Sequence, residues 1–146
     1  MGSTWTEHAL AGIETAGLRR GGARRAVVEY LGEQHCCRSA QEIFDGVRGA
    51  GGKAGIASVY RVLDTLTELR LVQRVDIGDG IARYESVLAD GGHHHHHLVC
   101  RDCGRVEPFE DGTLERALDS VAVDHGYAMD AHDVVLHGLC PACRAA

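Results

Sequence analysis

The sequence predicts an α+β protein with two small domains. Residues 1–88 form a winged helix-turn-helix, and residues 89–146 form an α/β domain with a three-stranded antiparallel sheet and a helix. Three observations support this prediction. Amphipathic helical segments are followed by a β-hairpin, and a short Gly-containing hinge, residues 88–92, follows the hairpin. The remaining residues contain five consecutive histidines and two Cys-x-x-Cys pairs, which indicates a cation-binding module.

The N-terminal half begins with helical segments. Residues 4–16 are weakly helical, and a second segment begins after the basic stretch 18–25. Ser39-Ala40-Gln41-Glu42 has the pattern of a capping box, which predicts a helix that ends at the glycine-rich residues 49–52. A further helix covers about residues 58–70. The residues expected to face the core are Trp5, Leu10, Ile13, Ala23, Val27, Val28, Leu31, Ile43, Phe44, Val47, Val59, Val62, Leu63, Leu66 and Leu69.

A β-hairpin follows these helices. Residues 71–77 and 81–87 flank Gly78-Asp79-Gly80, a turn sequence typical of hairpins. Helices followed by a two-stranded hairpin predict a winged helix-turn-helix, in which helix 58–70 enters the major groove of DNA by its N-terminal end. Ser58, Tyr60 and Arg61 lie there, and an arginine pairs well with a guanine edge or a phosphate. Arg24 and its basic neighbours could hold phosphates, although a solvated charged face is the alternative.

The charge distribution agrees with two modules. The whole chain has a net charge of −6, which by itself argues against nucleic acid as a partner. Residues 1–74, however, contain 10 Arg/Lys and 8 Asp/Glu, whereas residues 75–146 contain 5 and 13. A neutral-to-basic first half suits DNA, and an acidic second half rich in His and Cys suits cations.

Four cysteines predict a structural zinc site. Cys100, Cys103, Cys140 and Cys143 supply four thiolates, which close a tetrahedral Zn²⁺ site without an open position. Because residues 104–139 separate the pairs, the metal would pin the end of the domain to its start. Disulfides or a thioredoxin-like redox pair are the alternatives. No stretch resembles a secretory signal or has the length of a membrane span, so we expect a cytoplasmic protein with reduced thiols.

The histidine run can serve two further sites. The run is internal and continues directly into a Cys-x-x-Cys pair, so we do not interpret it as a purification tag. In a strand, His95 and His97 would point to one face and His94 and His96 to the other. Imidazole suits Zn, Fe, Ni and Cu. The alternative is a low-complexity tract that binds metals loosely.

Taken together, these residues resemble the ferric uptake regulator (Fur) superfamily of bacterial metal-dependent repressors over about residues 17–144. Three stretches carry the resemblance: Ser39-Ala40-Gln41-Glu42, the segment Gly55–Leu63, and the segment His93–Gly104. The resemblance implies a protein that binds an inverted-repeat operator in double-stranded DNA and a second domain that forms a homodimer. It also implies that the Cys-x-x-Cys pairs hold structural Zn²⁺.

The same resemblance implies two further metal sites. A regulatory site would contain Cys37, Glu85, His95 and His97, and an additional site would contain His94, His96, Glu115 and His132. Cys37 stands where many members have a histidine, so the pattern departs from the family here. Glu and His ligands favour Fe²⁺ at the regulatory site, whereas a sulfur ligand favours Zn²⁺. The function implied is an iron-sensing repressor, with a zinc-sensing repressor as the alternative.

Other functions remain open at this point. Cys36 and Cys37 could form a redox sensor, because the resembled family includes peroxide-responsive members. A metal-dependent enzyme would need an open coordination position, but the sequence contains no HExxH motif and no Ser or Cys nucleophile signature. A metal-storage protein would suit the His-rich half but would leave the winged helix without a purpose. We therefore expect a regulator that is not an enzyme and does not act at a membrane.

Overall fold

A computed structural model describes residues 4–87 and 95–146 of the chain. It divides into an N-terminal unit that ends at His93 and a C-terminal unit that begins at His94. The boundary predicted after residue 88 falls in residues 88–94, outside the described part. None of the helices in the described ranges combines the length and the apolar character needed to cross a bilayer.

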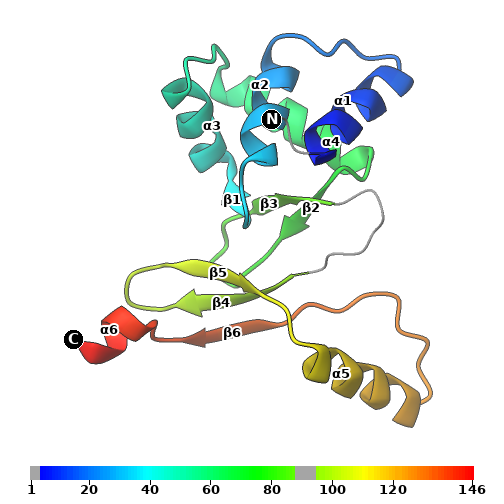
Figure 1. Ribbon diagram of the computed structural model, residues 1–146, viewed down its shortest axis with the longest axis vertical. Coiled ribbons are helices and arrows are strands. Elements are labelled where there is room, and N and C mark those ends of the chain that lie inside the picture. The colour runs from blue at the N-terminus through cyan, green and yellow to red at the C-terminus, as the bar shows by residue number, and fades with distance from the viewer. Residues whose placement is uncertain (1–3, 88–94) are drawn as a thin grey trace. The chain divides into compact units, whose positions relative to one another are not determined.

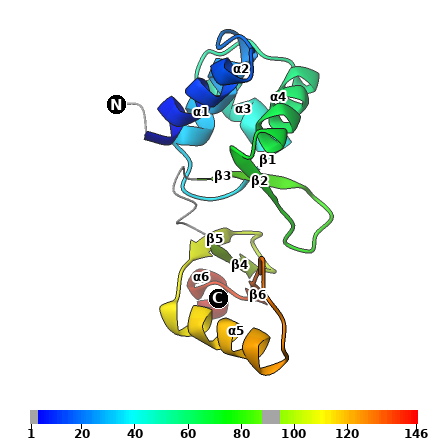
Figure 2. The same cartoon turned by 90° about the vertical axis from the view of Figure 1, so that its right-hand side faces the viewer.

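In the N-terminal unit, helices lie together on one side of a small sheet (Figures 1 and 2). The strand order is β1-β3-β2, with both pairings antiparallel. This agrees with the predicted winged helix-turn-helix and adds a short third strand, β1, to the two-stranded hairpin. The elements are α1 (Thr4–Thr15), α2 (Ala23–Gly32), β1 (Arg38–Ser39), α3 (Ala40–Gly49), α4 (Ile56–Glu68), β2 (Val72–Val75) and β3 (Arg83–Ser86).

The helices form because their apolar residues fall on one face and meet in a single core. Fully buried side chains come from α1, α2, α3 and α4, and each contributes about 1.5–3 kcal/mol relative to exposure. The predicted capping box is present: the Ser39 hydroxyl accepts from the Glu42 N–H at 3.1 Å, and the Glu42 carboxylate accepts from the Ser39 N–H at 2.8 Å. The two residues satisfy backbone donors that the first turn of α3 would otherwise leave unpaired.

The wing turn is longer than the hairpin pattern predicts. The Asp76 carboxylate accepts from the Gly78 N–H at 2.8 Å, and Asp79 accepts from the Ile81 N–H at 3.1 Å and pairs with Arg83 at 2.9 Å. Gly78 has a φ of 88°, a conformation that favours glycine. These side-chain bonds hold residues 76–82 in the turn, so β2 and β3 are shorter than the predicted strands.

The C-terminal unit contains a second three-stranded sheet, with strand order β5-β4-β6. β5 pairs antiparallel to β4, as predicted, but β6 runs parallel to β4, so the predicted all-antiparallel sheet is corrected to a mixed sheet. The physical reason is the crossover that carries α5, because a connection of this length can return a strand in parallel. The elements are β4 (His96–Cys100), β5 (Val106–Phe109), α5 (Gly112–Asp124), β6 (Val135–Gly138) and α6 (Pro141–Ala145).

Helix α5 carries an apolar stripe that is only partly covered. The residues of the stripe are Leu114, Leu118, Val121 and Ala122. Within this chain no residue of α5 is buried, and Val121 is 55% exposed. A small three-stranded sheet offers too little apolar surface to cover the whole stripe of the helix. The apolar face of α5 is therefore left largely open.

Candidate metal centres and nucleic-acid interface

The four cysteines of the two Cys-x-x-Cys pairs come together in the C-terminal unit. Their sulfur atoms all lie within 4.8 Å of one another, and Cys103 Sγ lies 3.8 Å from Cys140 Sγ. β4 ends at Cys100, and Cys140 is the N-cap residue of α6. With Zn–S bonds of about 2.3 Å, tetrahedral geometry places two sulfur atoms about 3.8 Å apart. The cluster therefore fits one zinc ion.

Hydrogen bonds prepare this cluster for a cation. Backbone N–H groups, first that of Cys103 and then that of Cys140, lower the pKa of Cys100 to about 6. The Cys140 N–H lies 3.3 Å from Cys100 Sγ. A hydrogen bond with Cys140, followed by burial, instead raises the pKa of Cys143 to about 12. At neutral pH Cys100 is thus a thiolate while Cys143 keeps its proton, which metal binding would release.

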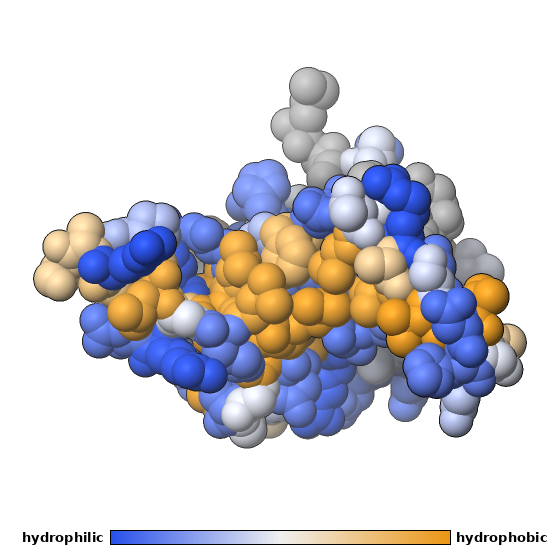
Figure 3. Space-filling model, turned by 90° about the horizontal axis from the view of Figure 1, so that it is seen from below, coloured by the Kyte–Doolittle hydropathy of each residue, from blue (hydrophilic) through white to orange (hydrophobic). Residues whose placement is uncertain are grey.

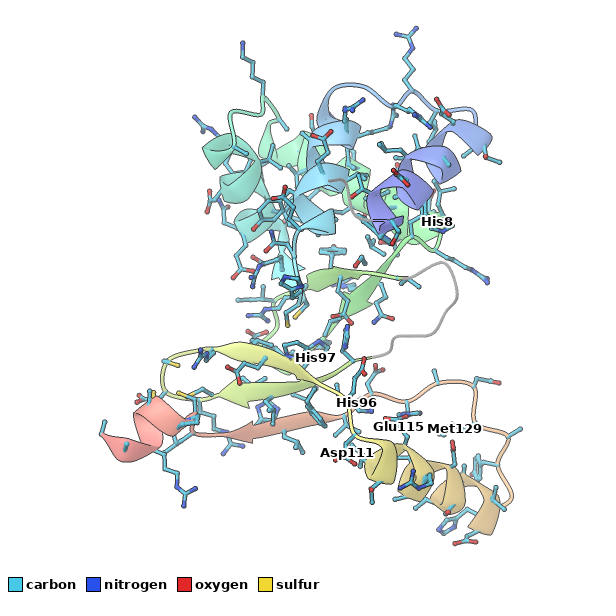
Figure 4. The ribbon with its side chains drawn as sticks, viewed as in Figure 1. His8, His96, His97, Asp111, Glu115 and Met129 are labelled. Carbon is cyan, nitrogen blue, oxygen red and sulfur yellow. The ribbon has the colours of Figure 1, made fainter. Side chains whose placement is uncertain are left out.

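A second cluster joins β4 to α5 and to the segment before β6. The Glu115 carboxylate binds the Nε2 atoms of two histidines, His96 at 2.5 Å and His132 at 2.7 Å. His96 is fully buried and points toward Glu115 (Figure 4). One carboxylate and two imidazoles within 4.8 Å are a suitable ligand set for Zn²⁺ or Fe²⁺. Three of the four residues predicted for the additional site therefore meet, and the fourth, His94, lies outside the described residues.

The ionisation of Glu115 follows from these neighbours. Burial raises its pKa, but the hydrogen bonds from His96 and then His132 outweigh burial, so the net pKa lies below the ordinary value. The carboxylate is consequently ionised at neutral pH. The Val134 N–H donates to His96 Nδ1 at 3.3 Å, so Nε2 carries the proton in this arrangement. A cation at Nε2 would require this proton to move to Nδ1, and the hydrogen bond from the Val134 N–H would then be lost.

The residues predicted for the regulatory site belong to both units. In the C-terminal unit, His95 Nδ1 lies 3.2 Å from a carboxylate oxygen of Glu110, and His97 is buried in β4. Sequence reasoning missed Glu110, because only the turn from β5 toward α5 brings it to His95. The expected alternation along the strand is present, since His96 enters the Glu115 cluster and neither neighbour does.

In the N-terminal unit, Cys37 and Glu85 are both buried. Glu85 lies in β3, where the Gln73 side-chain amide of β2 donates to its carboxylate at 2.5 Å. The Cys37 thiol lies 3.9 Å from the thiol of Cys36. Hydrogen bonding with Cys36, burial and the nearby Glu85 charge all hold the pKa of Cys37 far above its ordinary value. Sequence reasoning named Cys36 as a possible redox partner but did not include it in a ligand set.

The candidate DNA-binding residues gather around α4. Arg24, Ser58 and Arg61 line one surface groove of about 420 Å³ between the start of α2 and α4. An Arg61 guanidinium N–H donates to the Ser58 hydroxyl at 3.1 Å. Tyr60 does not line this groove, but it lies on α4 with half of its surface exposed. Two arginines beside the N-terminal part of an exposed helix can bind phosphate oxygens and base edges.

Comparison of the sequence with family models and with known proteins points to one family of regulators. The family model described as "Ferric uptake regulator family" matches residues 15–137. The ferric uptake regulation protein of Bacillus subtilis is 36% identical over 106 residues, which cover 73% of this chain and 71% of that protein. The zinc uptake regulation protein of Mycobacterium tuberculosis is 35% identical over 135 residues, 91% of this chain and all of that protein.

Two solved structures have the same fold as this chain. The Vibrio cholerae ferric uptake regulator superposes with a TM-score of 0.77 at 31% identity, covering 89% of this chain and 98% of that one. The Helicobacter pylori ferric uptake regulator, described as having three functional metal-binding sites, gives a TM-score of 0.80 at 26% identity. That match covers 97% of this chain and 92% of the other.

Proposed function

The chain belongs to the ferric uptake regulator family, and from this premise we propose that it is a metal-dependent transcriptional repressor, acting as a homodimer on operator DNA. The observation that carries the proposal is that one chain contains both an arginine-lined groove beside α4 and clusters of cation ligands in a separate unit. A DNA-binding groove alone would need no metal ligands, and a storage protein would need no groove. A regulator that binds DNA in response to a metal ion needs both the groove and the ligand clusters.

The Cys100, Cys103, Cys140 and Cys143 cluster has the role of a structural zinc site in this proposal. Its thiolates leave no open position, so the ion would serve the fold and not catalysis. The ion would hold the short helix α6 and the end of β6 against the end of β4. His94, His96, Glu115 and His132 form the additional site in the same proposal.

The regulatory site contains Glu85, His95 and His97, with Cys37 as a further ligand. Cys37 and Glu85 precede residues 88–94 in the sequence, and the two histidines follow them. A cation bound to ligands from both units would restrict the angle between them, and would hold the two recognition helices of a dimer about one helical turn of DNA apart. Without the cation, DNA binding itself must overcome the free-energy cost of ordering the units.

Oxygen and nitrogen ligands favour Fe²⁺ at this site, and sulfur favours Zn²⁺. Relatives named for iron uptake and for zinc uptake are similarly close to this chain. Iron remains the prediction from the Glu and His ligands alone. The role of the cysteines therefore decides between the two metals.

An exposed apolar surface of the C-terminal unit supports a homodimer. Apolar side chains form a continuous band on this surface (Figure 3). Contiguous apolar surface of this kind commonly marks a protein interface. The exposed apolar residues are Leu98, Val121, Val123, Tyr127, Leu136 and Leu139. Substituting Leu136 with Asp should shift the protein from dimer to monomer in light scattering coupled to gel filtration.

This proposal describes a regulator and not an enzyme, because the metal clusters have ligand sets suited to structural and sensing roles. Its partner is double-stranded DNA read by Arg24, Ser58, Tyr60 and Arg61. A repressor acts where the chromosome lies, so the same proposal places the protein in the cytoplasm.

The test is operator binding measured by fluorescence anisotropy. The protein keeps its thiolate-bound zinc, metal buffers set free Fe²⁺ and Zn²⁺, and the DNA comes from the promoter of its own gene. Binding should require one of the two metals, and the double variant Glu85→Ala/His97→Ala should lose that dependence. Asp119→Ala/His137→Ala removes one carboxylate and one imidazole outside the ligand sets and should behave as the unaltered protein. Binding that ignores both metals would contradict the proposal.

A further inference from the structure

Two adjacent cysteines lie before β1, and the regulatory proposal uses only one of them. Cys36 and Cys37 are both buried, both reduced, and 3.9 Å apart at their sulfur atoms. In a regular strand, neighbouring side chains point to opposite faces. Here the chain bends at His35 and Cys36 before β1 begins, which brings the two thiols together.

The distance between the thiols matches that of sulfur ligands on one ion. In the four-cysteine cluster, Cys103 and Cys140 are 3.8 Å apart. Two thiolates on one tetrahedral zinc ion are expected at about 3.8 Å. Cys36 and Cys37 therefore already have the spacing of a chelating pair.

A carboxylate of the same unit lies beside this pair. β1 pairs antiparallel with β3, with Arg38 opposite Tyr84 and Ser39 opposite Arg83. Continued by one residue, this register places Cys37 opposite Glu85, and the Glu85 charge acts on the Cys37 thiol. The Gln73 amide donates to the Glu85 carboxylate and orients it. The strand pairing thus places one carboxylate opposite the second of the two thiols, within the N-terminal unit.

We propose that Cys36 and Cys37 together bind one thiophilic divalent cation, with Glu85 as the third ligand, and that Zn²⁺ is the cation in the cell. This inference rests on the proposed metal-dependent function and names the metal: two thiolates favour Zn²⁺ or Cd²⁺ over Fe²⁺ or Mn²⁺. Each thiol loses its proton to solvent as its sulfur binds the cation, and no electrons are transferred. A fourth coordination position remains for a further ligand.

Burial explains why the pair needs a thiophilic cation. Both sulfur atoms are buried, so a cation that binds them must displace the thiol protons with little help from solvent. A hard cation such as Mn²⁺ gains too little from sulfur to displace these protons. A cation with strong sulfur affinity displaces both protons and neutralises the local negative charge.

The first experiment counts reactive thiols in the unaltered protein. The chain has six cysteines, and the four of the zinc cluster are protected when one zinc ion is bound. Because both remaining thiols are buried, prolonged alkylation with iodoacetamide, which reaches them through local opening, should modify two thiols per chain as counted by intact-mass spectrometry. A second equivalent of Zn²⁺ should lower this number to none, and an equal concentration of Mn²⁺ should leave it at two. Protection of one thiol alone, or of neither by Zn²⁺, would overturn the proposal.

The second experiment assigns the sulfur ligands. Cd²⁺ is added to the protein that retains its structural zinc, and the sulfur-to-cadmium charge-transfer absorption is recorded. Cys36→Ser and Cys37→Ser should each lower the absorption by about half, and the double variant should abolish it. Glu33→Ala, an exposed carboxylate close by in the sequence, should leave it unchanged. An unchanged signal in Cys36→Ser would overturn the proposal, provided that circular dichroism shows a folded protein.

These outcomes separate this site from the proposed function. If operator binding depends on metal while both thiols stay reactive with Zn²⁺, the repressor proposal stands and the two-sulfur site fails. If both thiols are protected while operator binding ignores every metal, the site stands and the repressor proposal fails.

Discussion

Trp5 should be one of the most sensitive positions of the N-terminal unit. α1 lies almost entirely before residue 15, where the family match begins, yet its buried residues are part of the core. Trp5 is 3% exposed, and its indole N–H donates to the Leu71 carbonyl at 3.1 Å, at the junction of α4 and β2. Replacing a buried tryptophan by alanine costs about 3–5 kcal/mol, the sum of lost transfer free energy and the cavity left behind.

The indole ring accounts for most of that cost. The Leu71 carbonyl also accepts from the Val87 N–H at 2.9 Å, so it keeps one donor when the indole is removed. Trp5→Phe, which retains an aromatic ring and loses the N–H, should therefore cost only about 1 kcal/mol. Trp5→Ala should remove a large part of the total stability, since a small domain has about 5–15 kcal/mol.

Urea unfolding followed by far-ultraviolet circular dichroism measures this cost. The signal comes largely from α1–α4, so it reports the N-terminal unit. His8→Ala is the matched control, because His8 lies exposed on the same helix and should change the free energy of unfolding by at most about 0.5 kcal/mol. If Trp5→Ala proved no more destabilising than His8→Ala, the docking of α1 on the core would be wrong.

Three further predictions follow from the site and the fold. Ser39→Ala should lower the unfolding free energy by about 1 kcal/mol through loss of the cap of α3, measured in the same urea experiment. Arg61→Ala should weaken operator binding and lower the slope of log K against log salt by about 2, if each protomer of a dimer loses one phosphate contact, as measured by anisotropy at several salt concentrations. After zinc removal, alkylation of Cys100 should rise as pH passes about 6, because its depressed pKa leaves the thiolate present above that pH. Cys143, with a pKa of about 12, should stay slow over that range, as peptide mass spectrometry can check.

Local patterns in the sequence were sufficient to predict the helix cap at Ser39, the alternation of the histidine side chains and the pairing of the four cysteines. The capping box at Ser39 depends on residues three positions apart, and the alternation of the histidines depends on the strand period of two. The two Cys-x-x-Cys pairs predict a shared cation because four thiolates complete one coordination shell. The capping box, the histidine alternation and each Cys-x-x-Cys pair lie within a short stretch, so their chemistry can be inferred from their spacing, although residues 104–139 separate the two cysteine pairs.

Other features depend on contacts between distant residues. The parallel pairing of β6 depends on how the chain crosses back after α5, and strand β1 exists only because β3 is available as its partner. Glu115 meets His96 and His132 across 19 and 17 residues of sequence, and only the resemblance to a known family suggested that set. Glu110 beside His95 was not predicted by either route.

The adjacent cysteines show the difference most clearly. The sequence by itself determined that two thiols stand together before a helix cap, which left a metal ligand at Cys37 or a redox pair as the alternatives. Only the tertiary structure decided that a bend before β1 turns both sulfur atoms toward each other, 3.9 Å apart, and that the β1–β3 register brings a carboxylate alongside. Side-chain direction depends on backbone geometry and on which strand pairs alongside, and neither is encoded in the identity of two neighbouring residues.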